Sequence, residues 1–422
     1  MATKPKVFYC DPIKGSSSGD GSRSRPWGTL EAVVKARLVN GADPAKGAVH
    51  AGDTIKLMSG DHGRPVLQGP EFAATDVITV EALDGHQPVM SQMTGTGLTN
   101  WTFRGLAVQL PDVALPKWSM VWRLTDVTGV TVEDCDIRTA ADATTWTDRE
   151  WEARCPWYGL WIRGTEISVR KNRLYGLENC VFVEGDRIAV DSNTIEYFIN
   201  DGIQHSASNL KITRNRITDL YDLKSNQFHH DGMQGWNFAH EPLRNVLIEG
   251  NFVAYSTGKY KSIPPIGTAT FQGIAVFDGT FAHFVVRDNV VMATAPHGIG
   301  LYGMNDCVIE NNTVLYQGDP SRSPCWIGVF PRRASEGGAD PENVVVRNNI
   351  SPTYNLAANG VEAENNFAFQ APPKPWNKFA VVDPAKTFKR YDLTNAAFDL
   401  TVREDSPAAG RIVRIGGAGA QQ

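Results

Sequence analysis

The chain has 422 residues and a formal net charge of −5, with 42% hydrophobic and 21% charged residues. This composition excludes a disordered or collagen-like chain. No run approaches the roughly 18–20 apolar residues that a membrane helix needs, and the balanced charge does not suit binding to nucleic acid by phosphate neutralisation. We therefore expect neither a membrane nor a nucleic acid as partner.

The N-terminal residues contain no apolar segment of the kind found in signal peptides. We expect that a signal was removed or that the protein leaves its cell another way, for example as part of a virion, which predicts an extracellular or virion-associated location. Six cysteines are too few for a disulfide scaffold. Cys135 and Cys307 occupy apolar positions and are predicted to be reduced, whereas a disulfide between Cys155 and Cys325, which lie in insertions, is left open.

Residues 29–38 form the one good amphipathic helix of the sequence, and residues 53–57 form the first predicted strand. From there a pattern recurs: a β-branched residue, two polar residues, Asn, any residue and an apolar residue. The Asn spacings are 21, 22, 36, 38, 23 and 37, which fit a unit of about 22 residues that sometimes carries an extra loop. The repeated Asn residues are Asn172, Asn193, Asn215, Asn251, Asn289, Asn312 and Asn349, and Cys135 fills the same position one unit earlier.

Alternating residues between Gly and Asn turns predict short strands, and a period of about 22 without a helix favours a parallel β-helix with one coil per repeat. A leucine-rich repeat would need Leu at fixed positions, which are missing. Asn at a fixed position suits a left-handed turn, and stacked Asn side chains can form a hydrogen-bonded ladder. We predict an N-terminal segment with a capping helix over residues 1–50, the β-helix over 51–370 and a C-terminal cap over 371–422, because a solenoid must cover its open ends.

A second column of residues precedes the Asn column. Its members are Gly159, Cys180, Gly202, Gly232, Gly273 and Gly298, and the residues directly before them are Tyr158, Asn179, Asp201, Asp231, Gln272 and His297. Equivalent residues of stacked coils lie about 4.8 Å apart. Such a row forms a surface along which an extended polymer can lie.

The richest part of this row consists of two Asp-Gly-apolar-Gln segments, at 201–204 and 231–234. One Asp-Gly is usually only a turn, but two in register bring two carboxylates together, and their repulsion raises one pKa unless a cation lies between them. We therefore predict either a general acid with its partner base or a calcium site formed by Asp201 and Asp231; no other cofactor is expected. The flanking candidates are His205, His230 and Lys224 for catalysis and Gln204, Gln234, His229 and His297 for substrate binding.

Tryptophans are concentrated in the insertion before residue 158, where Trp146, Trp151 and Trp157 precede Trp161 on the following strand. Aromatic faces bind the apolar faces of sugar rings. Some of these residues are expected to pack in the core, whereas Trp157 and Trp161 are candidates for substrate binding.

The chain resembles right-handed parallel β-helix proteins of the pectate-lyase-like superfamily. The resemblance rests on the Gly-rich segment 15–27 with the following Gly-Thr-Leu, on the Asn column and on the terminal Ser-Pro-Ala-Ala-Gly at 406–410, and it covers nearly the whole chain. It is specific for fold and weak for reaction, because the fold is found in lyases, hydrolases, epimerases and phage tailspikes.

The favoured hypothesis is depolymerisation of an acidic polysaccharide by β-elimination at a uronic acid. Asp201 and Asp231 could instead serve a glycoside hydrolase as acid and base or nucleophile. The Asp-Asp and Arg-Ile-Lys motifs of β-helix polygalacturonases and the Asp-Pro-His-Asp motif of C5-epimerases are absent. A non-catalytic polysaccharide-binding tail protein or adhesin is the third class; the protein would be a monomer, or a trimer if it is a tailspike.

Overall fold

The computed structural model describes residues 4–41, 43, 46–224, 229–237, 241–356, 358–370 and 379–409. The chain divides into two compact units, Met1–Thr194 (unit 1) and Ile195–Gln422 (unit 2). In both units each coil contributes strands to two parallel sheets, a larger and a smaller one. The predicted parallel β-helix is therefore confirmed for each unit.

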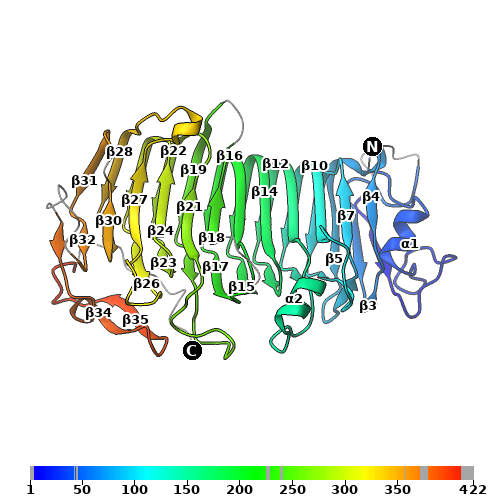
Figure 1. The fold of residues 1–422 in the computed structure, drawn as a ribbon. Coiled ribbons are helices and arrows are strands. Elements are labelled where there is room, and N and C mark those ends of the chain that lie inside the picture. The colour runs from blue at the N-terminus through cyan, green and yellow to red at the C-terminus, as the bar shows by residue number, and fades with distance from the viewer. Residues whose placement is uncertain are drawn as a thin grey trace. The chain divides into compact units, whose positions relative to one another are not determined.

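In unit 1 the equivalent strands of successive coils pair in parallel, as β10, β12 and β14 do in Figure 1. The larger sheet contains β1 (Val7–Cys10), β2 (Thr54–Leu57), β4 (Val66–Gln68), β5 (Ala73–Ala82), β7 (Met93–Thr96), β8 (Thr99–Arg104), β10 (Met120–Glu133), β12 (Tyr158–Arg170) and β14 (Asn179–Asp191). The smaller sheet contains β3 (Gly60–Asp61), β6 (Pro88–Met90), β9 (Ala107–Gln109), β11 (Asp136–Arg138) and β13 (Arg173–Tyr175).

Unit 2 repeats this arrangement, and β15 (Thr194–Phe198) begins at the boundary. The larger sheet contains β16 (Ile203–Thr213), β18 (His230–Gly235), β19 (Leu243–Glu249), β21 (Phe271–Val276), β22 (Phe281–Arg287), β24 (His297–Tyr302), β25 (Met304–Glu310), β27 (Trp326–Phe330), β28 (Glu342–Arg347), β30 (Thr353–Asn355) and β31 (Val361–Glu364). The smaller sheet continues from β15 with β17 (Arg216–Leu220), β20 (Phe252–Ala254), β23 (Val290–Ala293), β26 (Thr313–Tyr316), β29 (Ile350–Ser351), β32 (Phe367–Ala368) and β33 (Ala380–Val381).

The repeated Asn residues form buried hydrogen-bonded ladders inside both units. In unit 2, Asn251 donates from its backbone N and from Nδ2 to Oδ1 of Asn289, which donates in the same way to Asn312. The left-handed residue is not the Asn, as the sequence suggested, but the residue before it, for example Asp288 with φ 57°. This turn directs the following Asn side chain into the coil, where every member of the ladder is at most 2% exposed.

Helix α1 (Leu30–Lys35) lies within the predicted segment 29–38, begins after the N-cap Thr29 and buries Leu30, Val33 and Val34. Its role as an N-terminal cap stays a prediction. The sequence missed β1, which precedes α1 and pairs with β2, so residues 53–57 are not the first strand. It also missed α2 (Asp148–Arg154) in the tryptophan-rich insertion, although Thr147 and Glu150 form a capping box that is readable in the sequence.

The C-terminal segment packs over the smaller sheet of unit 2. Helix α3 (Pro384–Thr387) leads into an antiparallel hairpin of β34 (Phe388–Asp392) and β35 (Ala397–Val402). Phe388 and Leu400 share a buried cluster with residues of β20, β23, β26, β29 and β32. Part of the predicted cap, residues 371–378 and 410–422, lies outside the described residues. That the tail also closes the end of the solenoid stays a prediction.

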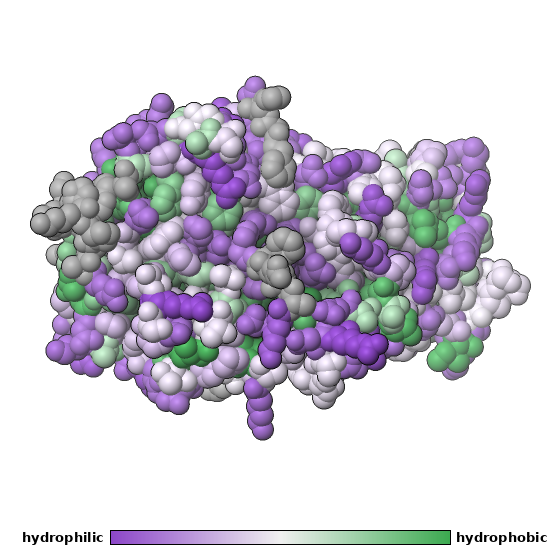
Figure 2. Space-filling view, viewed as in Figure 1, coloured by the Kyte–Doolittle hydropathy of each residue, from purple (hydrophilic) through white to green (hydrophobic). Residues whose placement is uncertain are grey.

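The viewed face is mostly hydrophilic, with apolar patches between the polar side chains (Figure 2). Short 3-10 turns at Pro70–Phe72 and Ala334–Glu336 complete the helical elements of the described chain, in which no helix is long and apolar enough to cross a membrane. All six cysteines are free, which confirms the prediction for Cys135 and Cys307 and excludes a disulfide between Cys155 and Cys325 in this structure.

Candidate functional site

The strand registers confirm the predicted row in unit 2. Gln204 lies opposite Gln234, which places Asp201 level with Asp231, and Asp231 lies opposite Gln272. Ile274 lies opposite Ile299, which continues the row to His297. The four residues before the glycines therefore lie level with one another on successive coils, with Asp201 two residues before β16 and the other three in β18, β21 and β24.

The glycines that follow these residues mark a close approach between the two sheets. A Cβ atom at Gly232 would lie 2.2 Å from Cγ1 of Val253 in β20, and one at Gly273 would lie 2.1 Å from Cγ1 of Val291 in β23. Gly202 and Gly298 meet Ile217 and Val314 in the same way. Because no side chain fits at these positions, the glycine column fixes the backbone from which the row projects.

The Asp pair is buried and hydrogen-bonded. Asp201 is 3% exposed, its Oδ1 accepts the backbone N–H of Asp231 at 2.8 Å, and its Oδ2 accepts from Nε2 of Gln204. Burial and the neighbouring charge of Asp231 raise the pKa of Asp201 to about 7. Burial also raises the pKa of Asp231, against the opposing effect of His229. Burial therefore favours the protonated form of both carboxyl groups, and the charge of Asp231 adds to this effect at Asp201, as expected for two adjacent carboxyl groups.

His229 is the histidine that the structure places beside this pair. Its Nδ1 lies 2.9 Å from Oδ2 of Asp231, and its side chain is 46% exposed. The hydrogen bond with Asp231 raises the pKa of His229 above its usual 6.5, although burial opposes the change. With Nδ1 held by the carboxylate, Nε2 is the nitrogen left for a substrate.

His205 and His230 are corrections to the sequence-based assignment. His205 is 0% exposed and lies opposite Gly235 in the strand register. A Cβ atom added at Gly235 would lie 2.5 Å from Cε1 of His205, so the imidazole packs against this glycine. His230 is 1% exposed and lies opposite the buried Phe271. Burial lowers the pKa of both imidazoles to about 4. Both are therefore neutral packing residues that a polymer does not reach.

His297 lies in an aromatic cluster at the far end of the row. Its ring packs 4.6 Å from that of Trp326, and its Nε2 lies 3.2 Å from the hydroxyl of Tyr302. Burial and the positive charges of His229 and Arg333 lower the pKa of His297 to about 4. His297 is thus a neutral hydrogen-bonding group.

Arg333 lies in the insertion between β27 and β28, whose arginines the sequence offered as positive charge beside the row. It forms an ion pair with Asp278, lies over the rings of Phe277 and Tyr302 at 5.3 and 5.9 Å, and is 47% exposed. Its charge acts on both His229 and His297. The insertion that carries it thus brings a cation to the row.

The remaining candidates are less constrained. Gln234 is half-buried on β18 and continues the row of Gln204. Lys224 is exposed and makes no hydrogen bond or ion pair with a described residue, and the predicted loop beyond it, residues 225–228, lies outside the described part of the chain. The structure therefore does not bring Lys224 to the Asp pair. Lys259 instead forms an ion pair with Glu196.

The tryptophans separate into two groups, all in unit 1. Trp146, just before α2, and Trp151, within it, are 7% and 0% exposed, and their rings pack against each other. They therefore do not line a groove. Trp157 and Trp161 are half-buried and lie 5.7 Å apart, ring to ring. Of these four residues, Trp157 and Trp161 remain available to a sugar.

The donor set does not support the expected calcium site. Calcium takes six to eight oxygen ligands, but no group of three or more His, Cys, Asp or Glu residues able to hold a metal occurs among the described residues. Oδ1 of Asp201 is already occupied by the backbone N–H of Asp231.

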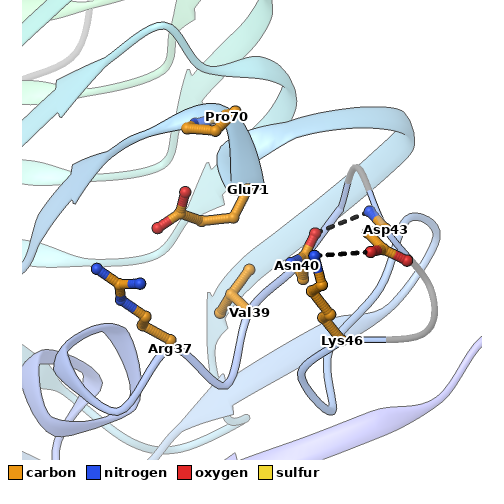
Figure 3. A pocket seen from close by; sticks show the side chains of 7 residues that line it. All are labelled: Arg37, Val39, Asn40, Asp43, Lys46, Pro70 and Glu71. Atoms are coloured by element: carbon orange, nitrogen blue, oxygen red, sulfur yellow. Dashed lines mark hydrogen bonds and ion pairs between the residues drawn. The ribbon is translucent and has the colours of Figure 1, made fainter.

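A depression formed by residues between 37 and 71 is distant in sequence from the Asp pair, and no histidine lines it. It encloses about 370 Å³, and in Figure 3 Lys46 and Asn40 both contact Asp43, at 3.3 and 2.8 Å. Its charged side chains are surface groups over Val39. We therefore place the candidate site at the row in unit 2.

Comparisons with known proteins agree with this architecture. No family model and no curated protein matches the chain. Among solved structures, the A-module of the mannuronan C-5 epimerase AlgE6 from Azotobacter vinelandii has 12% sequence identity and a TM-score of 0.55, over 84% of this chain and 94% of that one. The fold is the right-handed parallel β-helix.

Two further solved structures match the chain with lower scores. Pectate lyase Pel9A is 15% identical with a TM-score of 0.46, over 96% of this chain and 91% of that one. The Dettilon tailspike protein gp208 is 14% identical with a TM-score of 0.45 over 78% of this chain, which spans 62% of the tailspike's length.

Proposed function

We propose that this β-helix protein is a polysaccharide lyase that cleaves an acidic polysaccharide by β-elimination at a uronic acid. The observation that carries the proposal is the pairing of His229 with Asp231 beside Asp201, whose pKa of about 7 lets it keep a proton. The group therefore holds an imidazole base that is oriented by a carboxylate and partly exposed. Such a base is needed to remove a proton next to a carboxylate.

In this scheme the half-buried amide of Gln234 and the partly exposed guanidinium of Arg333 bind the uronate carboxylate and reduce its charge, which makes the C5 proton more acidic. His229, oriented through Nδ1 by Asp231, accepts that proton at Nε2. The C4–O4 bond then breaks, a C4–C5 double bond forms, and the leaving oxygen takes a proton from the imidazolium or from water. Arg333 adds positive charge at the same row, as its effect on His229 indicates.

Hydrolysis is the second candidate, because two carboxyl groups on neighbouring coils with raised pKa values also suit an acid and base pair. C5-epimerisation shares the first proton transfer of the lyase. A polysaccharide substrate and an extracellular or virion-associated location accompany all three possibilities. A binding protein without turnover remains the non-catalytic alternative.

The test is incubation with polygalacturonate, alginate, xylan and galactan, followed by ultraviolet absorbance, reducing ends and NMR of the product. New absorbance from an unsaturated uronate that disappears in His229→Ala, but persists in the buried-site variant His205→Gln, supports the lyase. Reducing ends without absorbance indicate the hydrolase, and inversion at C5 without cleavage indicates the epimerase. No change in any polymer overturns the proposal of an enzyme acting on these substrates.

A further inference from the structure

Unit 1 carries a second, partly exposed aromatic surface that contains none of the candidate catalytic residues. We define the tryptophan platform as Trp118, Trp157 and Trp161. The ring centroids of Trp118 and Trp157 are 4.5 Å apart, and those of Trp157 and Trp161 are 5.7 Å apart. Trp118 is 58% exposed, and the buried rings of Tyr158 and Phe182 pack against Trp161. The platform is thus a rigid apolar shelf open to solvent.

The backbone of Trp118 is unusual for so large a residue. Ser119 donates its N–H to the carbonyl of Pro116, which closes a turn with Trp118 at the third position and φ of 67°. Glycine is favoured there, because the left-handed conformation is unfavourable for a residue with a side chain. A strained residue that is also exposed contributes little to packing, so it suggests a role in binding.

Positive charge lies directly beside the platform. Arg123 on β10 lies opposite Trp161 on β12, so the two side chains start from adjacent strands. Arg123 is exposed and makes no ion pair or hydrogen bond with any residue that the structure describes, whereas Arg163, two positions beyond Trp161, is held by Asp126 at 3.1 Å. Lys117 lies 4.7 Å over the Trp118 ring. The platform therefore joins apolar faces to an unpaired guanidinium.

We propose that the tryptophan platform binds an acidic sugar residue of a polysaccharide. Its C–H faces would stack on the indoles, and its carboxylate would bind the guanidinium of Arg123, which suits planar carboxylates. This proposal rests on the proposed function in one respect, namely that the polymer is an acidic polysaccharide. It concerns binding, because no titratable group of the candidate catalytic cluster belongs to the platform.

The test is electrophoresis of the folded protein through native gels that contain polygalacturonate, alginate or neutral galactan. We expect retardation in an acidic gel and a loss of about threefold to tenfold in affinity for Trp118→Gly, the effect of one aromatic contact. The melting temperature of Trp118→Gly should stay the same or rise, because glycine accepts the left-handed turn. Arg123→Ala should weaken binding to acidic polymers only, and the control Arg187→Ala, which removes an arginine paired with Asp186 and Glu166, should bind as the wild type does.

Three results would overturn this inference: no retardation of the wild type in either acidic gel, normal binding by Trp118→Gly, or equal losses of Arg123→Ala in acidic and neutral gels. The two proposals fail separately. Turnover of an acidic polymer with normal binding by Trp118→Gly refutes the platform alone, whereas binding that depends on Trp118 without any turnover refutes the lyase alone.

Discussion

Replacing Asp201 by Asn should make the stability of the protein less sensitive to a rise in pH from about 4 to beyond 7. A pKa of about 7 in the folded state, against 3.8 for an unperturbed Asp, means that the folded protein binds more protons between these values. Stability must therefore fall as pH rises from about 4 to beyond 7. At 1.36 kcal/mol for each pKa unit, the loss in the wild type has a ceiling of about 4 kcal/mol. Asn does not ionise, and its Oδ1 can still accept the backbone N–H of Asp231.

The assay is urea unfolding of the wild type and Asp201→Asn at pH 5 and pH 9, analysed as a difference between the two proteins. We expect Asp201→Asn to gain up to about 3 kcal/mol relative to the wild type between these pH values, because only about two of the pKa units of the shift lie above pH 5. Asp126→Asn, which changes a carboxylate that is 61% exposed, serves as the control and should show little change. A difference that does not vary with pH, or a wild type that becomes relatively more stable at pH 9, would refute the assignment of a buried, protonated Asp201.

Three further predictions concern activity and the frame. His229→Ala should lower kcat by about 10²–10⁴-fold. The rising limb of the wild-type pH profile should lie above pH 6.5, because the Asp231 carboxylate raises the pKa of His229. Steady-state kinetics across pH measures both effects, and an unaltered rate in the folded variant would contradict the role of His229 as base. Asn289→Ala should destabilise unit 2 by about 3 kcal/mol, since it leaves buried hydrogen-bond donors of the ladder unpaired. Urea unfolding measures this change, with the exposed Asn343→Ala as control. Equal losses of unfolding free energy in the two variants would contradict the role of the ladder. Trp151→Ala should lower the melting temperature and leave polymer affinity in native gels unchanged, because the side chain is 0% exposed; reduced affinity at an unchanged melting temperature would instead make it a binding residue.

The sequence predicted those parts of the structure in which only one residue type fits a repeated position of the coil. Asn recurs because each ladder amide bonds the next, and Gly202 and Gly232 recur because the sheets approach too closely for a side chain. These two columns suffice to place Asp201 level with Asp231. A solenoid thus reveals its register in its sequence wherever the contacts follow its period.

The parts that could not be predicted depend on local direction or on long loops. His229 and His230 are neighbours, and only the path of the chain into β18 decides which imidazole is exposed and which is buried. Arg333 reaches Phe277 from an insertion that does not follow the period. Trp118 was missed because nothing in its neighbours indicates the left-handed turn that exposes it.

The glycine column lies directly beside a column of positions that can carry different side chains. A side chain at Gly232 or Gly273 would collide with Val253 or Val291, so these positions tolerate almost no substitution. The positions directly before them carry Asp231 and Gln272, different side chains on equivalent backbone. Such a row can acquire new chemistry by point mutation while the scaffold keeps its geometry. Exchanging residues along it is therefore a direct route to redesigning the specificity of the solenoid.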